Sequence, residues 1–247
     1  MNETEKKLLS MAATLQLSVY NGIVEGNVLV EPPISFCSGC IYKNFILSVL
    51  HGCPKQPNQL IVASASVDSE GRTLNQILNP QFMTLGKITE EGILTDFKEV
   101  DFLYSAYDES QKYSFLIPDD TTPGCFHEFG RYRFTEIIKP NMDEEYFFFG
   151  HTRCKPDIEG KKIMSSPRFE VCKYKSETKT KPFFYRFQMD KIVKDANDLR
   201  GCSGAPILNA EGKLVSLVVE ALIPSNVLFG INLYSLNEII SATAGIG

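Results

Sequence analysis

The chain has 247 residues, 43% of them hydrophobic and 22% charged, and a net charge of −5. These values are ordinary for a soluble globular protein, and the length allows one or two domains. No apolar run approaches the ~20 residues that a membrane span needs, and the polar residues 1–9 do not resemble a signal peptide. The seven cysteines form no short-spaced disulfide framework. We therefore expect reduced thiols, a cytoplasmic location and no membrane partner.

The first half of the chain predicts one helix followed by strands. Residues 4–17 carry apolar side chains at helical spacing, so an N-terminal amphipathic helix is expected over 1–17. Short β-rich runs broken by turn signals follow in 18–30. The remaining strands expected here are apolar runs bounded by turn formers, and the first two form a hairpin: 36–41, 45–50, 60–67, 84–88 and 102–107.

The second half also predicts strands. Residues 118–124 are rich in turn formers and predict the connection between two halves. The expected strands are 146–150, 205–208, 214–219 and 229–233. The turn 209–212 joins two of them as a hairpin, and Ser235 with Glu238 forms a capping box that predicts a helix to about Ala242.

One turn carries the strongest sign of chemistry. Residues 199–207 place Ser203 on a turn flanked by Gly201 and Gly204, ahead of an apolar strand. Glycine adopts backbone conformations closed to other residues, so the turn can aim the N–H groups of Gly201 and Ser203 at one point. Two such donors form an oxyanion hole. The alternative interpretation is an ordinary glycine-rich β-turn.

A serine nucleophile needs a base and a group that orients the base. His51 ends the apolar run 44–50, and Asp101 directly precedes the apolar run 102–105. Asp96 and Asp108 are close competitors for the orienting role, but only Asp101 immediately begins a strand-like run. The other two histidines, His127 and His151, are interpreted as surface or hydrogen-bonded residues.

These three pieces, with the motif Gly201-Cys-Ser-Gly-Ala-Pro206, resemble the chymotrypsin/trypsin superfamily of serine proteases, including its intracellular Deg-type members. The order His, Asp, Ser is also that of chymotrypsin. The resemblance implies an all-β fold of two six-stranded antiparallel β-barrels with an N-terminal and a C-terminal helix. The implied domains are a helix over 1–17, a barrel over 18–117 with His51 and Asp101, and a barrel over 118–247 with Ser203.

The implied activity is that of a trypsin-like serine endopeptidase with a regulatory role. Ser203 would attack the peptide carbonyl, His51 would transfer the proton, and Asp101 would orient His51. The expected partners are a protein or peptide substrate and a regulatory protein. No cofactor and no metal are expected, and nucleic acid is not an expected partner.

The family also implies where the substrate pocket lies. Its base is about six residues before the nucleophile, at Asn197, next to Asp198. The other wall would come from about Val218 to Ala221, which includes Val219 and Glu220, and from Gly230. The acids in this region slightly favour a basic P1 residue, and an uncharged P1 stays open.

Zinc binding and a cysteine nucleophile are the alternatives to this assignment. Cys37, Cys40, His51 and Cys53 include zinc-type ligands, but residues three apart on one strand lie on opposite faces. Cys202 replaces the aspartate that digestive relatives carry, so zymogen activation does not transfer. A cysteine nucleophile would occupy position 203 of the motif, so Cys202 is interpreted as a buried thiol.

The sequence leaves two further classes of function open. One is an inactive binding module with the same fold. The other is an adaptor that uses residues 151–182, where nine Lys/Arg face four acidic residues. A solvated hairpin is the simpler interpretation of this basic segment.

Overall fold

The structure is a computed structural model. It describes the backbone over residues 1–20, 23–25, 28–31, 34–43, 45–49, 62–67, 73–77, 83–88, 93–100, 102–108, 113–118, 132–157, 162–179 and 183–237. Side chains are described over residues 1–15, 36–43, 47–49, 132–154, 165–179 and 183–237.

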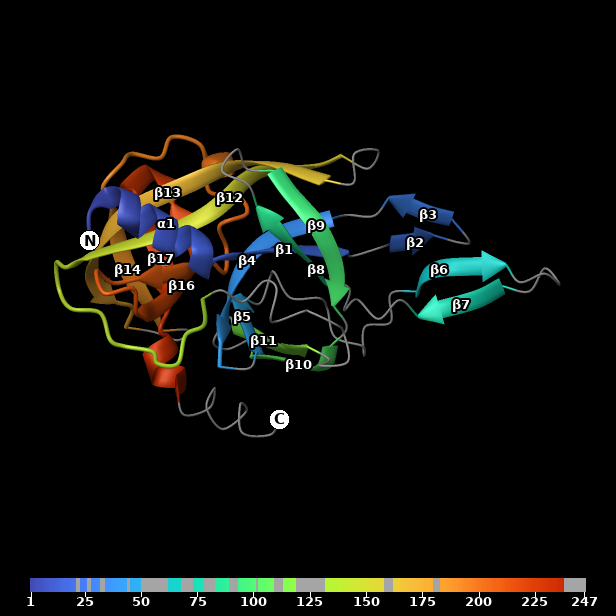
Figure 1. The fold of residues 1–247 in the computed structure, drawn as a ribbon, viewed down its shortest axis with the longest axis horizontal. Coiled ribbons are helices and arrows are strands. Elements are labelled where there is room, and N and C mark those ends of the chain that lie inside the picture. Colours follow the sequence, from blue (N-terminus) through green and yellow to red (C-terminus); the bar gives the residue numbers. More distant parts are fainter. Residues whose placement is uncertain are drawn as a thin grey trace.

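The C-terminal half forms a closed six-stranded antiparallel barrel (Figure 1). Its strands are β12 (Glu145–Asp157), β13 (Lys162–Glu177), β14 (Phe184–Met189), β15 (Pro206–Leu208), β16 (Leu214–Leu222) and β17 (Val227–Ile231). The order is β13-β12-β15-β16-β17-β14, and β14 pairs back onto β13. Closure leaves no strand edge of this barrel unpaired along its whole length.

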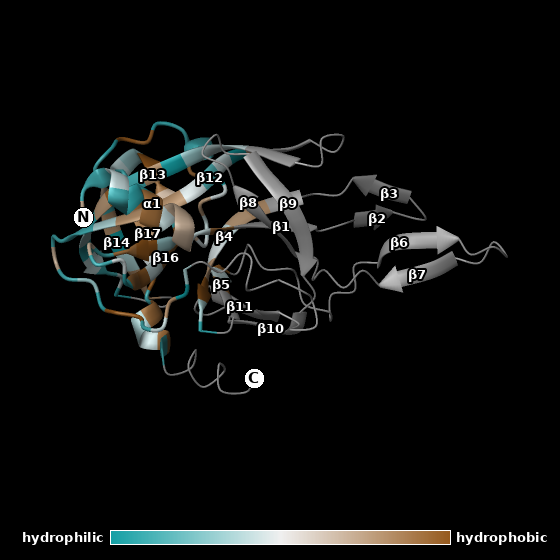
Figure 2. Ribbon diagram, in the orientation of Figure 1, coloured by the Kyte–Doolittle hydropathy of each residue, from teal (hydrophilic) through white to brown (hydrophobic). Residues whose placement is uncertain are grey.

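Large apolar side chains fill the barrel, and Figure 2 shows hydrophobic residues along its strands. Tyr146, Phe148 and Phe187 lie in this inner cluster and are almost completely buried. Phe147, which points to the other face of β12, belongs to a second cluster outside the barrel. A strand that is buried on both faces has a continuous apolar sequence, which explains the run 146–149.

The N-terminal strands continue the same sheet in the order β10-β11-β5-β4-β1-β8-β9. Their bounds are β1 (Leu15–Tyr20), β4 (Ile34–Tyr42), β5 (Phe45–Val49), β8 (Met83–Ile88), β9 (Ile93–Val100), β10 (Phe102–Asp108) and β11 (Tyr113–Pro118). Among the described strands β9 and β10 do not pair, so one barrel is seen closed. Two separate hairpins are formed by β2 (Ile23–Glu25) with β3 (Val28–Glu31), and by β6 (Val62–Val67) with β7 (Thr73–Ile77).

Strand β13 joins the two parts through its pairing with β9. The second hydrophobic cluster, to which Phe147 belongs, lies where the two parts meet. It includes Cys40 and Leu47 from β4 and β5 and Leu217 from the barrel. The clustered side chains come from distant segments of the chain, so their burial holds the two parts together.

Helix α1 (Glu3–Ala13) covers the barrel beside β12 (Figure 1). It begins with a capping box in which Asn2 and Glu5 satisfy each other's backbone N–H groups. It ends before Thr14, earlier than predicted, because Leu15 already pairs with Gly39 of β4. Tertiary pairing therefore overrides the helical spacing at Leu15.

The predicted C-terminal helix also has a different start. Residues 233–237 are helical, so the helix begins before Ser235. Asn232 caps it, because its side-chain oxygen accepts the N–H of Ser235 at 3.0 Å. The Ser235–Glu238 capping box is therefore wrong. No helix among the described residues has the length and apolar character needed to cross a membrane.

Strand β16 allows a test of the buried core. Leu217 is fully buried, whereas Leu222 on the same strand is 50% exposed. We expect Leu217→Ala to lower the free energy of unfolding by about 2–5 kcal/mol, because it removes buried methyl groups and leaves a cavity. Leu222→Ala is the matched control and should change it by less than about 0.5 kcal/mol. Urea denaturation measures both, and equal losses would contradict the described core.

Candidate active site

Ser203 lies on a tight turn that follows the 3₁₀ helix η2 (Ala196–Asp198). The backbone of this turn is closely hydrogen-bonded. The N–H of Cys202 donates to the carbonyl of Leu199 at 2.9 Å, and the N–H of Ala205 donates to the carbonyl of Cys202 at 2.9 Å. These hydrogen bonds within the turn stabilise its shape.

Two positions in the turn require glycine. Gly201 has φ +109°, and a Cβ there would lie 2.2 Å from the carbonyl oxygen of His151. Gly204 has φ +87°, and a Cβ there would lie 1.9 Å from the carbonyl oxygen of Ser38. Both glycines therefore combine a left-handed backbone with a close approach of another chain segment.

Strand β4 supports the turn from the other side. The backbone N–H of Ser38 donates to the carbonyl of Ser203 at 2.6 Å. The Ser38 hydroxyl donates to the carbonyl of Gly201 at 2.8 Å. The carbonyl of Ser38 in turn accepts the hydroxyl of Ser48 from β5 at 2.8 Å. The predicted hairpin therefore positions Ser203.

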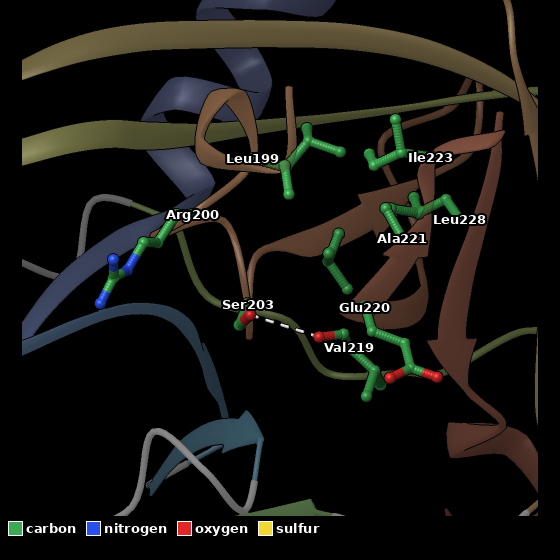
Figure 3. Close-up of a pocket in the computed structure, with 10 residues that line it drawn as sticks. Leu199, Arg200, Ser203, Val219, Glu220, Ala221, Ile223 and Leu228 are labelled. Atoms are coloured by element: carbon green, nitrogen blue, oxygen red, sulfur yellow. Dashed lines mark hydrogen bonds between the residues drawn. The ribbon is translucent and has the colours of Figure 1, made fainter. Parts of the chain in front are cut away.

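The Ser203 side chain is half-buried. Its hydroxyl donates to the carbonyl of Val219 at 3.2 Å (Figure 3). Within the described part of the chain, the N–H groups of Gly201 and Ser203 donate to no acceptor. The turn thus combines a hydroxyl with two unengaged backbone donors.

A pocket of about 190 Å³ opens beside Ser203. Most of the side chains that line it are aliphatic (Figure 3). Its lining consists of Ala196, Leu199, Arg200, Ser203, Val218, Val219, Glu220, Ala221, Ile223 and Leu228. The volume is below the roughly 300–1,000 Å³ of drug-sized ligand sites and suits a single side chain.

Two residues of this lining carry a charge. Glu220 is exposed, and the guanidinium of Arg200 points away from the other labelled side chains. The interior of the pocket is therefore apolar.

The predicted pocket residues divide into two groups. Val219 and Glu220 line this pocket, as expected for one wall. Asn197, Asp198 and Gly230 are not part of its lining. Asn197 is exposed and bonded to Asp195, and Asp198 forms an ion pair with an arginine on β12.

The pocket contains residues that sequence reasoning missed. Ala196, Leu199, Ile223 and Leu228 line it without having been predicted. The available signal was the apolar character of the residues that flank the turn and follow β16. Their shared location was not readable from spacing, because they come from separate segments of the chain.

The other two predicted triad members, His51 and Asp101, lie outside the described residues, and so does His127. Strand β5 ends at Val49, two residues before His51. In the neighbouring strands Tyr113 is in register with Val49, and Asp108 is in register with Tyr113.

The register of β10 with β11 helps to choose between Asp101 and Asp108 as the orienting acid. Phe102, which directly follows Asp101, is in register with Pro118 at the other end of the β10–β11 pair. The described strands therefore place Asp108 at the end of β5 that leads to His51. They do not bring Phe102 to that end.

The cysteines near the site are buried. Cys202 is fully buried against Gly150, and burial raises the pKa of its thiol to about 12. A thiol with such a pKa is a poor nucleophile at neutral pH. Cys37 and Cys40 are buried on β4, and no described group of residues could hold a metal ion.

His151 lies directly behind the turn. It is 1% exposed, and its Nδ1 lies 2.9 Å from the hydroxyl of Ser165. Burial lowers the pKa of its imidazole to about 4, so the ring is neutral at neutral pH. Its backbone carbonyl is the group that faces Gly201. The interpretation of His151 as a hydrogen-bonded residue is therefore confirmed, and it is a structural support of the turn.

The fold is that of the chymotrypsin-like serine proteases. It combines the closed barrel, the glycine-flanked turn at Ser203 and the adjoining pocket. The particular likeness is to solved structures of Rv3671c, a protease of M. tuberculosis. Its active form has a TM-score of 0.55 and 10% identity, over 94% of this chain and 80% of that chain. Its inactive form has a TM-score of 0.52 and 10% identity, over 95% of this chain and 90% of that chain.

An inactive serine-to-alanine mutant of the same protease gives a TM-score of 0.53 at 10% identity, over 98% of this chain and 92% of that chain. Neither a family model nor a curated protein matches the sequence. The likeness supports the predicted chymotrypsin-like fold, of which the described strands show one closed barrel.

The buried imidazole of His151 makes the stability of the fold depend on pH. The unfolded chain restores its pKa from about 4 to the ordinary value of 6.5, so unfolding takes up a proton as the pH falls below 6.5. We expect the free energy of unfolding to fall by about 2 kcal/mol between pH 7 and pH 5 from this group. Urea denaturation at both pH values measures the change.

His151→Gln provides the control, because it keeps a polar side chain of similar size without a titrating ring. The pH-dependent loss should be smaller in this variant by that amount. An identical loss in both proteins would show that His151 is not the group that titrates.

Proposed function

We propose that the protein is a serine endopeptidase that cleaves a protein or peptide substrate through an acyl-enzyme. The observation that carries this proposal is the turn at Ser203. A half-buried hydroxyl lies there beside an apolar pocket, and the N–H groups of Gly201 and Ser203 have no described acceptor. This is the arrangement that acyl transfer needs for a nucleophile and an oxyanion hole.

The support for His51 as the base comes from strand β5. Ser48 is connected to Ser203 through one residue, because Ser38 bonds to both. His51 follows Ser48 by three residues, and an extended chain spans at most about 10 Å over that length. We propose that His51, two residues beyond the end of β5, takes the hydroxyl proton of Ser203. The N-terminal strands would then form the second barrel of the fold.

The orienting acid has two candidates. The sequence favours Asp101, because it immediately precedes a strand. The strand register favours Asp108, because it is aligned with Tyr113 and through it with Val49. We propose Asp101 and treat Asp108 as the competitor. In either case the carboxylate would hold the imidazole in the required tautomer and stabilise its charged form.

Covalent labelling tests the nucleophile. A fluorophosphonate probe should form one adduct per chain on Ser203, because the hydroxyl becomes reactive only with its base and oxyanion donors in place. Ser203→Ala should abolish the adduct, and peptide mapping by mass spectrometry locates it. Ser225→Ala is a matched control on an exposed hydroxyl and should label normally. A folded protein that is not labelled would be a binding module, and an adduct on Cys202 would contradict the role of Ser203.

Amide substitution distinguishes Asp101 from its competitors Asp108 and Asp96 as the orienting residue. Asp101→Asn should lower turnover roughly 10⁴-fold, because the imidazole is then held in the wrong tautomer. Asp108→Asn and Asp96→Asn should stay within about tenfold of the unmodified protein. Steady-state hydrolysis of a peptide substrate measures all three. If Asp108→Asn is the inactive variant, the strand register and not the apolar run identifies the orienting residue.

The pocket predicts the P1 preference. Its lining is aliphatic and Glu220 is exposed, so we expect Val, Leu or Ala at P1 rather than Lys or Arg. This reverses the preference suggested by the nearby acids, because Asp198 is already neutralised by an ion pair. An unpaired cation in an apolar pocket would cost several kcal/mol. Peptide-library profiling checks the expectation. A preference for Lys or Arg that disappears in Glu220→Gln would show that Glu220 determines the specificity.

A further inference from the structure

Four charged side chains form a continuous chain behind the Ser203 turn. Arg153 Nη2 lies 2.6 Å from Asp198 Oδ1, and Arg168 Nη1 lies 3.9 Å from Asp198 Oδ2. Arg168 Nε also lies 2.5 Å from Glu170 Oε1. We call the residues Arg153, Asp198, Arg168 and Glu170 the arginine clamp. Arg168 is the member that contacts both carboxylates.

Glu170 is an unusual component of this clamp. Its side chain is 2% exposed, and its Oε2 has no hydrogen-bond partner among the described residues. A buried carboxylate with an unsatisfied oxygen is costly, and an apolar residue in its place is often no less stable. Fold stability therefore does not explain why an acid lies here. Its position beside Arg168 does, because it fixes the direction of the guanidinium.

Arg153 provides a second, independent sign of constraint. Its φ of +54° is in the left-handed region, which a side-chain-bearing residue rarely adopts. It lies in a β-bulge of β12, where the register with β13 shifts between Thr152 and Lys155. Bulges near functional sites re-aim side chains, and this one directs Arg153 to Asp198. Local strain is thus tolerated for a contact with the segment that precedes Ser203.

The clamp ends on the backbone that shapes the turn. Asp198 is the last residue of η2, and the next residue, Leu199, provides the carbonyl that accepts the N–H of Cys202. Burial is the main cause of the raised pKa of the Cys202 thiol, and the charges of Arg168 and Glu170 have smaller effects, Arg168 lowering and Glu170 raising that pKa. Gly150, which is paired with Arg168 across the β12–β13 ladder, packs against the same cysteine. The clamp therefore contacts the segment before Ser203 at Asp198, and Arg168 is paired with the glycine that packs against Cys202 at the other end.

We propose that Arg168 is a positioning residue that holds the segment 195–203 in the shape in which the N–H groups of Gly201 and Ser203 point to the same place. Its catalytic consequence rests on the proposed protease function. Arg168 bridges an interior carboxylate on β13 and a carboxylate on the turn, which the planar guanidinium with its several donors can do at once. Loss of the bridge leaves Asp198 held by Arg153 alone and loosens the turn without altering the apolar pocket wall formed by β16.

Two variants separate this role from fold stability. Arg168→Met leaves the carboxylate of Glu170 buried without its cation and lowers the melting temperature. The double variant Arg168→Met/Glu170→Leu removes the whole buried pair and should recover the melting temperature. Both variants lack the bridge to Asp198. Arg186→Met is the matched control, because Arg186 is exposed on β14 and forms no ion pair in the described part of the chain.

Hydrogen–deuterium exchange followed by mass spectrometry provides the first measurement, because it requires no activity. The amides of Leu199, Cys202 and Ala205 are hydrogen-bonded within the turn. In both Arg168 variants we expect them to exchange at least tenfold faster, while the amides of β16 and β17 keep their rates. The Arg186→Met control should match the unmodified protein. Unchanged exchange in the double variant, or an equal increase in the control, would overturn the proposal.

Peptide hydrolysis provides the second measurement. In the double variant we expect kcat to fall at least tenfold while KM stays within about twofold, because the oxyanion donors lose their alignment and the pocket does not change. A rise in KM with unchanged kcat would overturn the positioning role. If the unmodified protein neither labels nor hydrolyses peptides while the exchange result holds, the protease proposal fails and the clamp stands as the device that orders the turn.

Discussion

The hydrogen bonds of Ser38 are the interaction on which the site depends. One residue of β4 donates to two carbonyls of the Ser203 turn and accepts the hydroxyl of Ser48 from β5. The bonds are buried, and each is worth about 1 kcal/mol net, while a donor or acceptor left unmade would cost about 1–3 kcal/mol. The turn belongs to the barrel, whereas its partners belong to the N-terminal strands. The site is thus assembled only when both parts are folded.

Close packing behind the turn leaves few alternatives to this shape. Gly201 and Gly204 are pressed against carbonyls from His151 and Ser38, and Gly150 is pressed against the thiol of Cys202. A larger side chain at Gly201 or Gly204 would displace backbone, and one at Gly150 would displace the thiol of Cys202. Protein interiors transmit such strain because they are packed at near-crystalline density. The position of the Ser203 hydroxyl therefore depends on residues that take no part in the proposed chemistry.

Much of the fold could be predicted from the sequence where apolar runs end at clear turn signals. The hairpins 36–50 and 205–219 were predicted for this reason, and the second contains Gly212 with φ +80° as the turn requires. Strand β14 was missed because exposed Arg186 and half-buried Gln188 interrupt its apolar residues. Strands β7 and β9 were missed because polar and charged residues interrupt their apolar residues. Strand β11 was also missed, although its sequence YSFLIP is mostly apolar and ends at a proline.

The site could be predicted only in part, for a geometric reason. The serine turn is local and has a sequence signature. The pocket wall is not local, and a count of residues back from Ser203 selected Asn197 for its base. In the structure Ala196 lines the pocket and Asn197 does not, although both are exposed residues of the 3₁₀ helix η2. Adjacent residues of such a tight helix point in different directions, and spacing alone cannot tell which of them borders the pocket.

Strand β13 has a mechanical consequence for the whole molecule. Its sixteen residues pair with β12 and β14 in the barrel, and near its start with β9 of the N-terminal strands. One uninterrupted backbone thus belongs to both parts, so a hinge between them would have to break main-chain hydrogen bonds. Rigid-body opening is consequently a poor way to switch this molecule on or off. Any change of state is left to the segments between strands, where rearrangement costs no sheet pairing.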